Sequence, residues 1–294
     1  MTPRPQLHFP SPYQLPTAHL SVARRVPMPD GALIASYVYV PDAYAEKADR
    51  SLADAAPAMP EPVLMLHGNG EEHGIFGQVI DVVCASGRPV AALDSRAQGN
   101  STRGTAELTY ELMAQDAVTA LAALGFGRAH LLGFSDGAIE ALIIARDRPE
   151  LALSLLSIGA NLSPDGVDDS FQMEQASLEL TAWADYWEKG DGSKRDVDPS
   201  LVRPTPREAR TTAELLHMMV VHPHIDPAGL VAISCPTTVM AGEFDEIKRE
   251  ETDLIHTSIP GSSLVIVPGA GHVLPKEASQ EVARVALETV ARAR

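Results

Sequence analysis

The segment Gly133–Gly137 reads GFSDG and places Ser135 between two glycines in the pattern G-x-S-x-G. An apolar run precedes it and a long apolar segment follows, so a buried strand would turn there directly into a helix. Such a turn strains the serine backbone and presents the hydroxyl at the carboxyl edge of a sheet. The pattern favours Ser135 as a nucleophile. The alternative is a helix-entry turn with Ser135 as its N-cap.

A serine hydroxyl needs a base to become nucleophilic, and the base needs an acid to orient it. Of the ten histidines, His272 lies in a glycine-rich loop, PGAGH, after a late apolar run. Asp245 lies in AGEFDEI, directly after another such run. Ser135, Asp245 and His272 therefore follow the chain order of a serine-centred triad, each at the carboxyl end of a predicted strand. Glu243 and Glu246 are competing acids, and position favours Asp245.

Charge that develops on a substrate carbonyl oxygen needs hydrogen-bond donors aimed at it. One donor would be the backbone N–H of Asp136, the residue after the predicted nucleophile. The segment His67–Gly70 (HGNG) follows an early apolar run, and its glycines let the main chain turn its amides inward. Asn69 is the candidate for the second donor, with an ordinary glycine turn as the alternative. At the start of a helix, the carboxylate of Asp136 is favoured by the helix dipole.

The elements that must position these residues alternate along the chain. Short apolar runs typical of buried strands lie at 62–66, 90–93, 128–134, 151–158, 237–240 and 264–267, and helical patterns lie at 76–85, 110–124, 137–148, 247–256 and 276–294. This alternation predicts a mainly parallel, doubly wound α/β sheet. Before it, 20–26 and 33–40 are separated by a turn at Asp30-Gly31 and predict two antiparallel strands. Residues 44–60 are polar and alanine-rich, and we expect a loop there.

The alternation stops between residues 163 and 228. This stretch holds Trp183 and Trp187, the charged run 188–198 and the apolar patch 215–221, which together predict two to four helices. We expect its apolar side to cover the edge of the sheet that carries the nucleophile. The predicted division is a core formed by residues 20–162 and 229–294, a helical lid at 163–228, and a proline-rich segment at 1–19.

Composition excludes several classes of protein. Hydrophobic residues make up 45% and charged residues 21% of the 294 residues, as in ordinary globular proteins. The net charge of −16 disfavours binding to nucleic acid or to anionic lipid surfaces. The N-terminal residues do not resemble a signal peptide and no apolar run could span a membrane, so we expect a cytoplasmic protein.

Metal and redox chemistry find little support in the sequence. Cys84 and Cys235 are too far apart for a CxxC pair or a zinc cluster, and they leave open one disulfide or two free thiols. His222 and His224 lack a nearby third ligand. We therefore predict no cofactor and no metal. The sequence shows neither a large apolar surface nor a basic patch, and we expect a monomer or homodimer that acts on a small-molecule substrate.

Taken together, the motifs resemble those of the α/β-hydrolase fold superfamily, and of its lid-bearing esterases and lipases. The matching segments are HGNG (67–70), DSRAQGNS (94–101), GFSDG (133–137), AGEFDEI (241–247) and PGAGH (268–272). The second departs from the family's D-x-R-G-x-G-x-S because Ala97-Gln98 replaces a glycine and a variable residue. The resemblance implies a mostly parallel eight-stranded sheet flanked by helices, its first two strands antiparallel, with a small helical lid inserted after the sixth strand.

These observations predict a cofactor-independent hydrolase that cleaves carboxylic esters through an acyl-enzyme on Ser135. The same residues could serve C–C bond hydrolysis, peptidase, thioesterase, acyltransferase or perhydrolase chemistry, and the sequence does not separate these. A non-catalytic ligand receptor on the same fold is the alternative outside enzymes.

Overall fold

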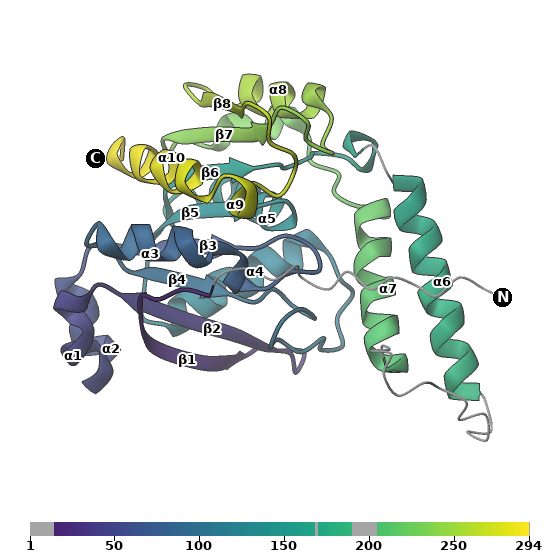
Figure 1. Cartoon of the computed structure of the whole chain (residues 1–294), viewed down its shortest axis with the longest axis horizontal. Coiled ribbons are helices and arrows are strands. Elements are labelled where there is room, and N and C mark those ends of the chain that lie inside the picture. The colour runs from purple at the N-terminus through teal and green to yellow at the C-terminus, as the bar shows by residue number, and fades with distance from the viewer. Residues whose placement is uncertain (1–14, 168–169, 190–204, 294) are drawn as a thin grey trace.

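An eight-stranded sheet forms the centre of the molecule, with strand order β1-β2-β4-β3-β5-β6-β7-β8 (Figure 1). The structure is a computed structural model, and it describes residues 15–167, 170–189 and 205–293. The strands are β1 His19–Pro27, β2 Leu33–Val40, β3 Val63–Leu66, β4 Val90–Leu93, β5 Ala129–Phe134, β6 Ala152–Ile158, β7 Thr237–Gly242 and β8 Ser263–Val267. β3 to β8 pair in parallel, whereas β1 and β2 are antiparallel to their neighbours. The predicted fold class is therefore confirmed.

Helices cover both faces of this sheet. α3 (Gly77–Ala85) and α10 (Ser279–Ala291) lie on one face, while α4 (Tyr110–Ala123), α5 (Asp136–Asp147) and α8 (Arg249–Ser258) lie on the other (Figure 1). Alternate residues of each strand serve the two cores. In β3, Leu64 and Leu66 join the core beneath α4 and α5, whereas Val63 and Met65 join the core beneath α3 and α10.

Between β6 and β7 the chain forms two antiparallel helices, α6 (Ser170–Lys189) and α7 (Pro206–Val221), with α7 between the sheet and α6 (Figure 1). α7 begins at a capping box formed by Thr205 and Glu208. Trp183 packs against the small apolar cluster that joins the two helices. The side chain of Trp187 and most of the charged run 188–198 lie outside the described residues. The predicted helical insert after the sixth strand is confirmed.

Two expectations about local structure are wrong. The stretch 44–60 is not a loop, because α1 (Asp42–Arg50), α2 (Leu52–Ala55) and a 3₁₀ turn at Ala56–Ala58 occupy it. Its alanines favour helix, Ser51 caps α2, and Ala48 and Ala55 are buried against the core. The C-terminal segment is not one helix but α9 (Leu274–Glu277) and α10, separated at Ala278 by a non-helical backbone.

The outer helix of the insert also corrects an expectation. α6 exposes the large side chains of Phe171, Leu178 and Tyr186, with exposed fractions of 67%, 57% and 59%. The prediction that the chain carries no marked apolar surface is therefore wrong for this helix. Sequence periodicity could not reveal it, because both sides of α6 carry apolar residues and only one side meets α7.

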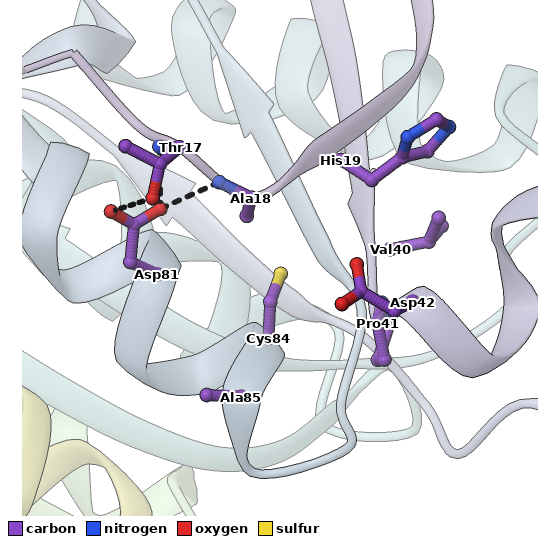
Figure 2. A pocket seen from close by; sticks show the side chains of 9 residues that line it. All are labelled: Thr17, Ala18, His19, Val40, Pro41, Asp42, Asp81, Cys84 and Ala85. Atoms are coloured by element: carbon purple, nitrogen blue, oxygen red, sulfur yellow. Dashed lines mark hydrogen bonds between the residues drawn. The ribbon is translucent and has the colours of Figure 1, made fainter.

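Two polar anchors hold β1 and β2 to the rest of the sheet domain. Asp81 of α3 accepts hydrogen bonds from the backbone N–H groups of Thr17 and Ala18, 2.7 and 2.8 Å long, at the start of β1 (Figure 2). At the other end of the hairpin, the buried guanidinium of Arg96 binds Asp30 and Asp116. The loop after β4 is thereby held against the β1–β2 turn, close to the edge of the sheet where the candidate site lies.

α5 carries a buried acid that makes stability depend on pH. Glu140 is 1% exposed, and burial, reinforced by the charge of Asp136, raises its pKa well above the usual glutamate value. The folded state thus retains a proton that the unfolded state has already released. The free energy of unfolding should therefore fall as pH rises above the unfolded pKa of about 4.3.

We expect Glu140→Gln to remove this loss, because the amide is never charged and still accepts from the Ser95 hydroxyl. In urea unfolding, the free energy of unfolding of the variant should equal that of the wild type near pH 4. Above pH 4 it should exceed the wild-type value by up to about 1.4 kcal/mol more for each pH unit. A stability difference that is constant from pH 4 to 8 would contradict burial of the charge as its cause.

Candidate active site

The turn between β5 and α5 places Ser135 in a backbone conformation that L-residues rarely adopt. Its φ is +53° and its ψ is −120°. A Cβ atom at Gly133 would lie 2.2 Å from the carbonyl oxygen of Gly137, and one at Gly137 would lie 2.2 Å from that of Leu66. Only glycine fits at these two positions, as the sequence pattern predicts. The Ser135 side chain, which accepts no cap hydrogen bond from the N–H groups of α5, is therefore free to face the carboxyl edge of the sheet.

The structure brings Ser135, His272 and Asp245 together. The Nε2 atom of His272 lies 3.0 Å from Ser135 Oγ, and its Nδ1 atom lies 2.6 Å from Asp245 Oδ1. A carboxylate can only accept, so Nδ1 carries the ring hydrogen and Nε2 of the neutral ring accepts from the Ser135 hydroxyl. The side chains of His272 and Asp245 are 12% and 3% exposed, so little water competes for these bonds.

The candidate acidic residues differ in what their carboxylates contact. Asp245 also accepts from the backbone N–H groups of Ile247 and Gly242, which fix its carboxylate. Glu243 instead accepts from the backbone N–H of Gly269, 2.8 Å away. Glu246 is exposed. Asp245 is therefore the acid that meets His272, and Glu243 stabilises the loop before it.

Burial and charge act on His272 in opposite directions. Burial lowers its pKa, but the hydrogen bond to Asp245 and the Asp245 charge together raise it by more, so the pKa of His272 lies above the usual value. Gly159, at φ +63°, follows β6, and a Cβ there would lie 2.9 Å from His272 Cε1. This glycine was not singled out in the sequence, although its place after a strand is a usable signal.

Glu277 of α9 holds the loop that carries His272. Its two carboxylate oxygens accept from the backbone N–H groups of Gly271 and Val273, at 2.6 and 3.0 Å. These are the residues on either side of His272. The break of the C-terminal helix at Ala278 therefore separates a short anchoring turn from the longer helix that packs on the sheet.

Asn69 and Asp136 lie next to each other, as the two predicted donor residues must. Asn69 Nδ2 donates to Asp136 Oδ2 over 3.0 Å. Asp136 is the first residue of α5, where a helix leaves its N–H groups without intrahelical partners. In the described part of the chain no backbone oxygen accepts from the N–H of Asn69. Both N–H groups are thus available to a ligand oxygen.

Gln98 and His67, which belong to the matching motifs, support this loop in ways that the sequence did not predict. Gln98 Oε1 accepts from the backbone N–H of Gly70 at 2.6 Å, and His67 Nε2 accepts from that of Ser95 at 2.8 Å. Ala97, before Gln98, has a φ of +67° and so takes the conformation of the glycine it replaces, which costs about 1–2 kcal/mol for alanine. The departure from the family motif at Ala97-Gln98 was the available signal.

Residues 71–73 lead from the loop after β3 into a 3₁₀ turn at His73–Phe76, and they are buried or half-buried. His73 is buried, and its Nδ1 lies 2.7 Å from Asp94 Oδ1 while its Nε2 lies 3.1 Å from the Tyr39 hydroxyl. Tyr37 stacks on its ring with centroids 3.7 Å apart. His73 therefore belongs to the structural support of the loop after β3. Glu71 forms an ion pair with Lys276 of α9.

Other candidate chemistry lies away from this cluster. Within residues 15–167, 170–189 and 205–293, no group of three or more His, Cys, Asp or Glu side chains is arranged to hold a metal ion. Cys84 and Cys235 are free thiols, and burial raises the pKa of Cys84 to about 12. The pocket beside Cys84 and His19 contains none of Ser135, Asp245 and His272 (Figure 2). No helix in the described ranges is long and apolar enough to cross a membrane.

Comparison with known proteins gives relatives of the same kind. The chain is 27% identical over 206 residues to the human serine hydrolase BPHL, covering 67% of each chain. Among solved structures, a thermophilic esterase from Thermogutta terrifontis superposes with a TM-score of 0.67 at 23% identity, covering 94% of this chain and 99% of the other. An esterase from Exiguobacterium antarcticum superposes with a TM-score of 0.68 at 18% identity, covering 92% and 100%.

These two structures, at such low identity, show the fold alone. The family is shown by the sequence itself, because residues 63–285 match the alpha/beta hydrolase family. That range extends from β3 through the helical insert to α10, and it includes Ser135, Asp245 and His272. The chain therefore belongs to the alpha/beta hydrolase family.

Proposed function

We propose that this protein is a serine hydrolase that cleaves carboxylic esters through a covalent acyl-enzyme. The observation that carries the proposal is the position of His272, which bridges Ser135 Oγ at 3.0 Å and Asp245 Oδ1 at 2.6 Å. This is the spacing that a nucleophile, its base and the orienting acid require. The similarity to a serine hydrolase and the esterases among the structural neighbours support it.

In the proposed mechanism, Ser135 Oγ attacks the ester carbonyl while His272 Nε2 takes its proton. Asp245 holds the Nδ1–H tautomer and stabilises the imidazolium. The backbone N–H groups of Asn69 and Asp136 donate to the oxyanion. His272 then returns the proton to the leaving alkoxide, and the alcohol departs. Water attacks the acyl-enzyme with His272 again as base, which releases the acid and restores the Ser135 hydroxyl.

We expect Ser135→Ala and His272→Ala each to lower kcat by roughly 10⁴–10⁶, with the double variant little worse, because the residues act as one unit. Assays with p-nitrophenyl acetate and labelling by a fluorophosphonate probe measure this. Ser154→Ala is the control, since this buried serine lies on β6 and contacts His130 rather than His272. Wild-type protein that is not labelled would favour a ligand receptor, and full activity in Ser135→Ala would exclude the mechanism.

The pH profile follows from the raised pKa of His272. The base works only when neutral, so kcat/KM should rise with pH through a midpoint above 6.5, the usual histidine value, and fall below it. Asp245→Asn removes the charge that raises this pKa, so its residual activity, lower by about 10⁴, should have a midpoint at lower pH. If Glu243→Gln had these effects and Asp245→Asn did not, the acid would be misassigned.

The proposed substrates are soluble esters with short to medium acyl chains. α7 lies over the site, with the carbonyl oxygen of Leu215 3.5 Å from Asn69 Nδ2 and with Leu215 and Met218 buried in the core. In this proposal the insert acts as a lid that excludes water and limits the acyl pocket. The net charge of −16 also disfavours work at anionic lipid surfaces.

We expect kcat/KM to peak at short or medium chains in a series of p-nitrophenyl esters from two to sixteen carbons. A peak at the longest chains with a rise above the micellar threshold would contradict this, and would assign the exposed side chains of α6 to lipid contact. Matched thioesters and amides in the same assay test the other reactions that the same residues support.

A further inference from the structure

The two residues whose backbone N–H groups are proposed to bind the oxyanion are also joined through their side chains. Asn69 comes from the loop after β3 and Asp136 begins α5, 67 residues later in the chain. The 3.0 Å bond from Asn69 Nδ2 to Asp136 Oδ2 is a link between the two donors that does not pass through the backbone.

The Asp136 end of this link is immobilised by the core. Asp136 is 2% exposed, and its second oxygen, Oδ1, accepts from the Tyr110 hydroxyl at 2.8 Å. Tyr110 opens α4 and is itself 1% exposed. α4 and α5 therefore fix the position of the Asp136 carboxylate, and the Asn69 side chain binds to this fixed group.

At the Asn69 end, Gly68 and Gly70 flank Asn69, and hydrogen bonds rather than side-chain bulk fix the peptide groups on either side. The Gly68 carbonyl, which shares a peptide group with the Asn69 N–H, accepts from His67 Nδ1 at 2.7 Å and from the Glu71 N–H at 3.3 Å. Gln98 fixes the N–H of Gly70, one residue further on. The Asn69 carboxamide, bonded to Asp136 and 3.5 Å from the Leu215 carbonyl oxygen of α7, adds a restraint that ties this loop to α5 and α7.

We propose that Asn69 is a positioning residue, whose side chain, held by Asp136 and through it by Tyr110, acts together with the hydrogen-bonded Gly68 carbonyl to keep the Asn69 backbone N–H aimed at the oxyanion. The inference rests on the proposed function, since it concerns how the oxyanion site of that reaction is held. The link also has an electrostatic role. An unpaired carboxylate beside the oxyanion would oppose the developing charge, and the hydrogen bonds from Asn69 and Tyr110 draw electron density away from it.

Exchange of the two side chains tests this link. Asn69→Ala removes the donor, and Asn69→Asp sets a second carboxylate against that of Asp136. Each should lower kcat for p-nitrophenyl acetate by about 10- to 100-fold with KM changed less than about twofold, because the loss falls on the transition state. The double variant Asn69→Asp/Asp136→Asn again pairs an amide donor with a carboxylate, and it should recover most of the kcat lost in Asn69→Asp.

A boronic acid inhibitor gives a readout that a general loss of stability would not move. Its tetrahedral adduct on Ser135 places a negative oxygen in the oxyanion site, so its inhibition constant should rise with the fall in kcat/KM across the variants. Thr289→Val is the control, because it removes a buried 2.6 Å hydrogen bond to Thr238 at a distance from the site and should leave kcat and boronate affinity unchanged.

The outcomes separate this inference from the proposed function. If the wild type is labelled by fluorophosphonate but Asn69→Ala keeps full kcat and boronate affinity, the inference is overturned alone. Failure of the double variant to recover activity, while it remains folded by circular dichroism, also overturns it. A wild type that is neither labelled nor active overturns the proposed function and this inference with it.

Discussion

The turn at Ser135 is the constraint on which the rest of the site depends. A residue at φ +53° followed at once by a helix is unfavourable in isolation, and it persists only because β5 and α5 are both buried and hold the turn from either side. The close approach of Gly133 to Gly137 and of Gly137 to Leu66 fixes where β3 lies relative to this turn. The loop after β3, with Asn69, is thereby brought to the residue that follows Ser135.

The strands and the order of the motifs were predictable because they rest on local signals. A buried parallel strand appears as a short apolar run, and β2 and β4 have the bounds that the sequence indicates. The helices at 42–55 were missed because a polar, alanine-rich stretch has no clear apolar periodicity, and only a few small residues such as Ala48 and Ala55 meet the core. The exposed face of α6 was missed because burial depends on its partner α7.

The proposed triad could likewise be assigned from strand ends and chain order, whereas the residues that orient it could not. Gln98 acts on Gly70, and Tyr110 acts on Asp136, across 28 and 26 residues of sequence. Such contacts connect loops whose mutual position is set only by the folded sheet. Glu277 is closer to His272 in sequence, yet its role depends on the break at Ala278, which an amphipathic pattern running through it conceals.

Apart from the Tyr110–Asp136 bond, these contacts share one physical feature, which is that side chains bind the backbone N–H groups of the loops that carry the site. Glu277 holds both neighbours of His272, Gln98 holds Gly70, and Asp245 itself is held by the N–H of Ile247. Loops at a sheet edge lack the ladder hydrogen bonds that fix strands, so their geometry must come from such contacts. The proposed reaction needs hydrogen-bond donors held in position to within a few tenths of an ångström. Carboxylate and amide side chains outside the proposed triad therefore position the loops that carry these donors. In a chain this rich in acidic residues, part of the negative charge is thus used as hydrogen-bond acceptors for the loops rather than left on the surface.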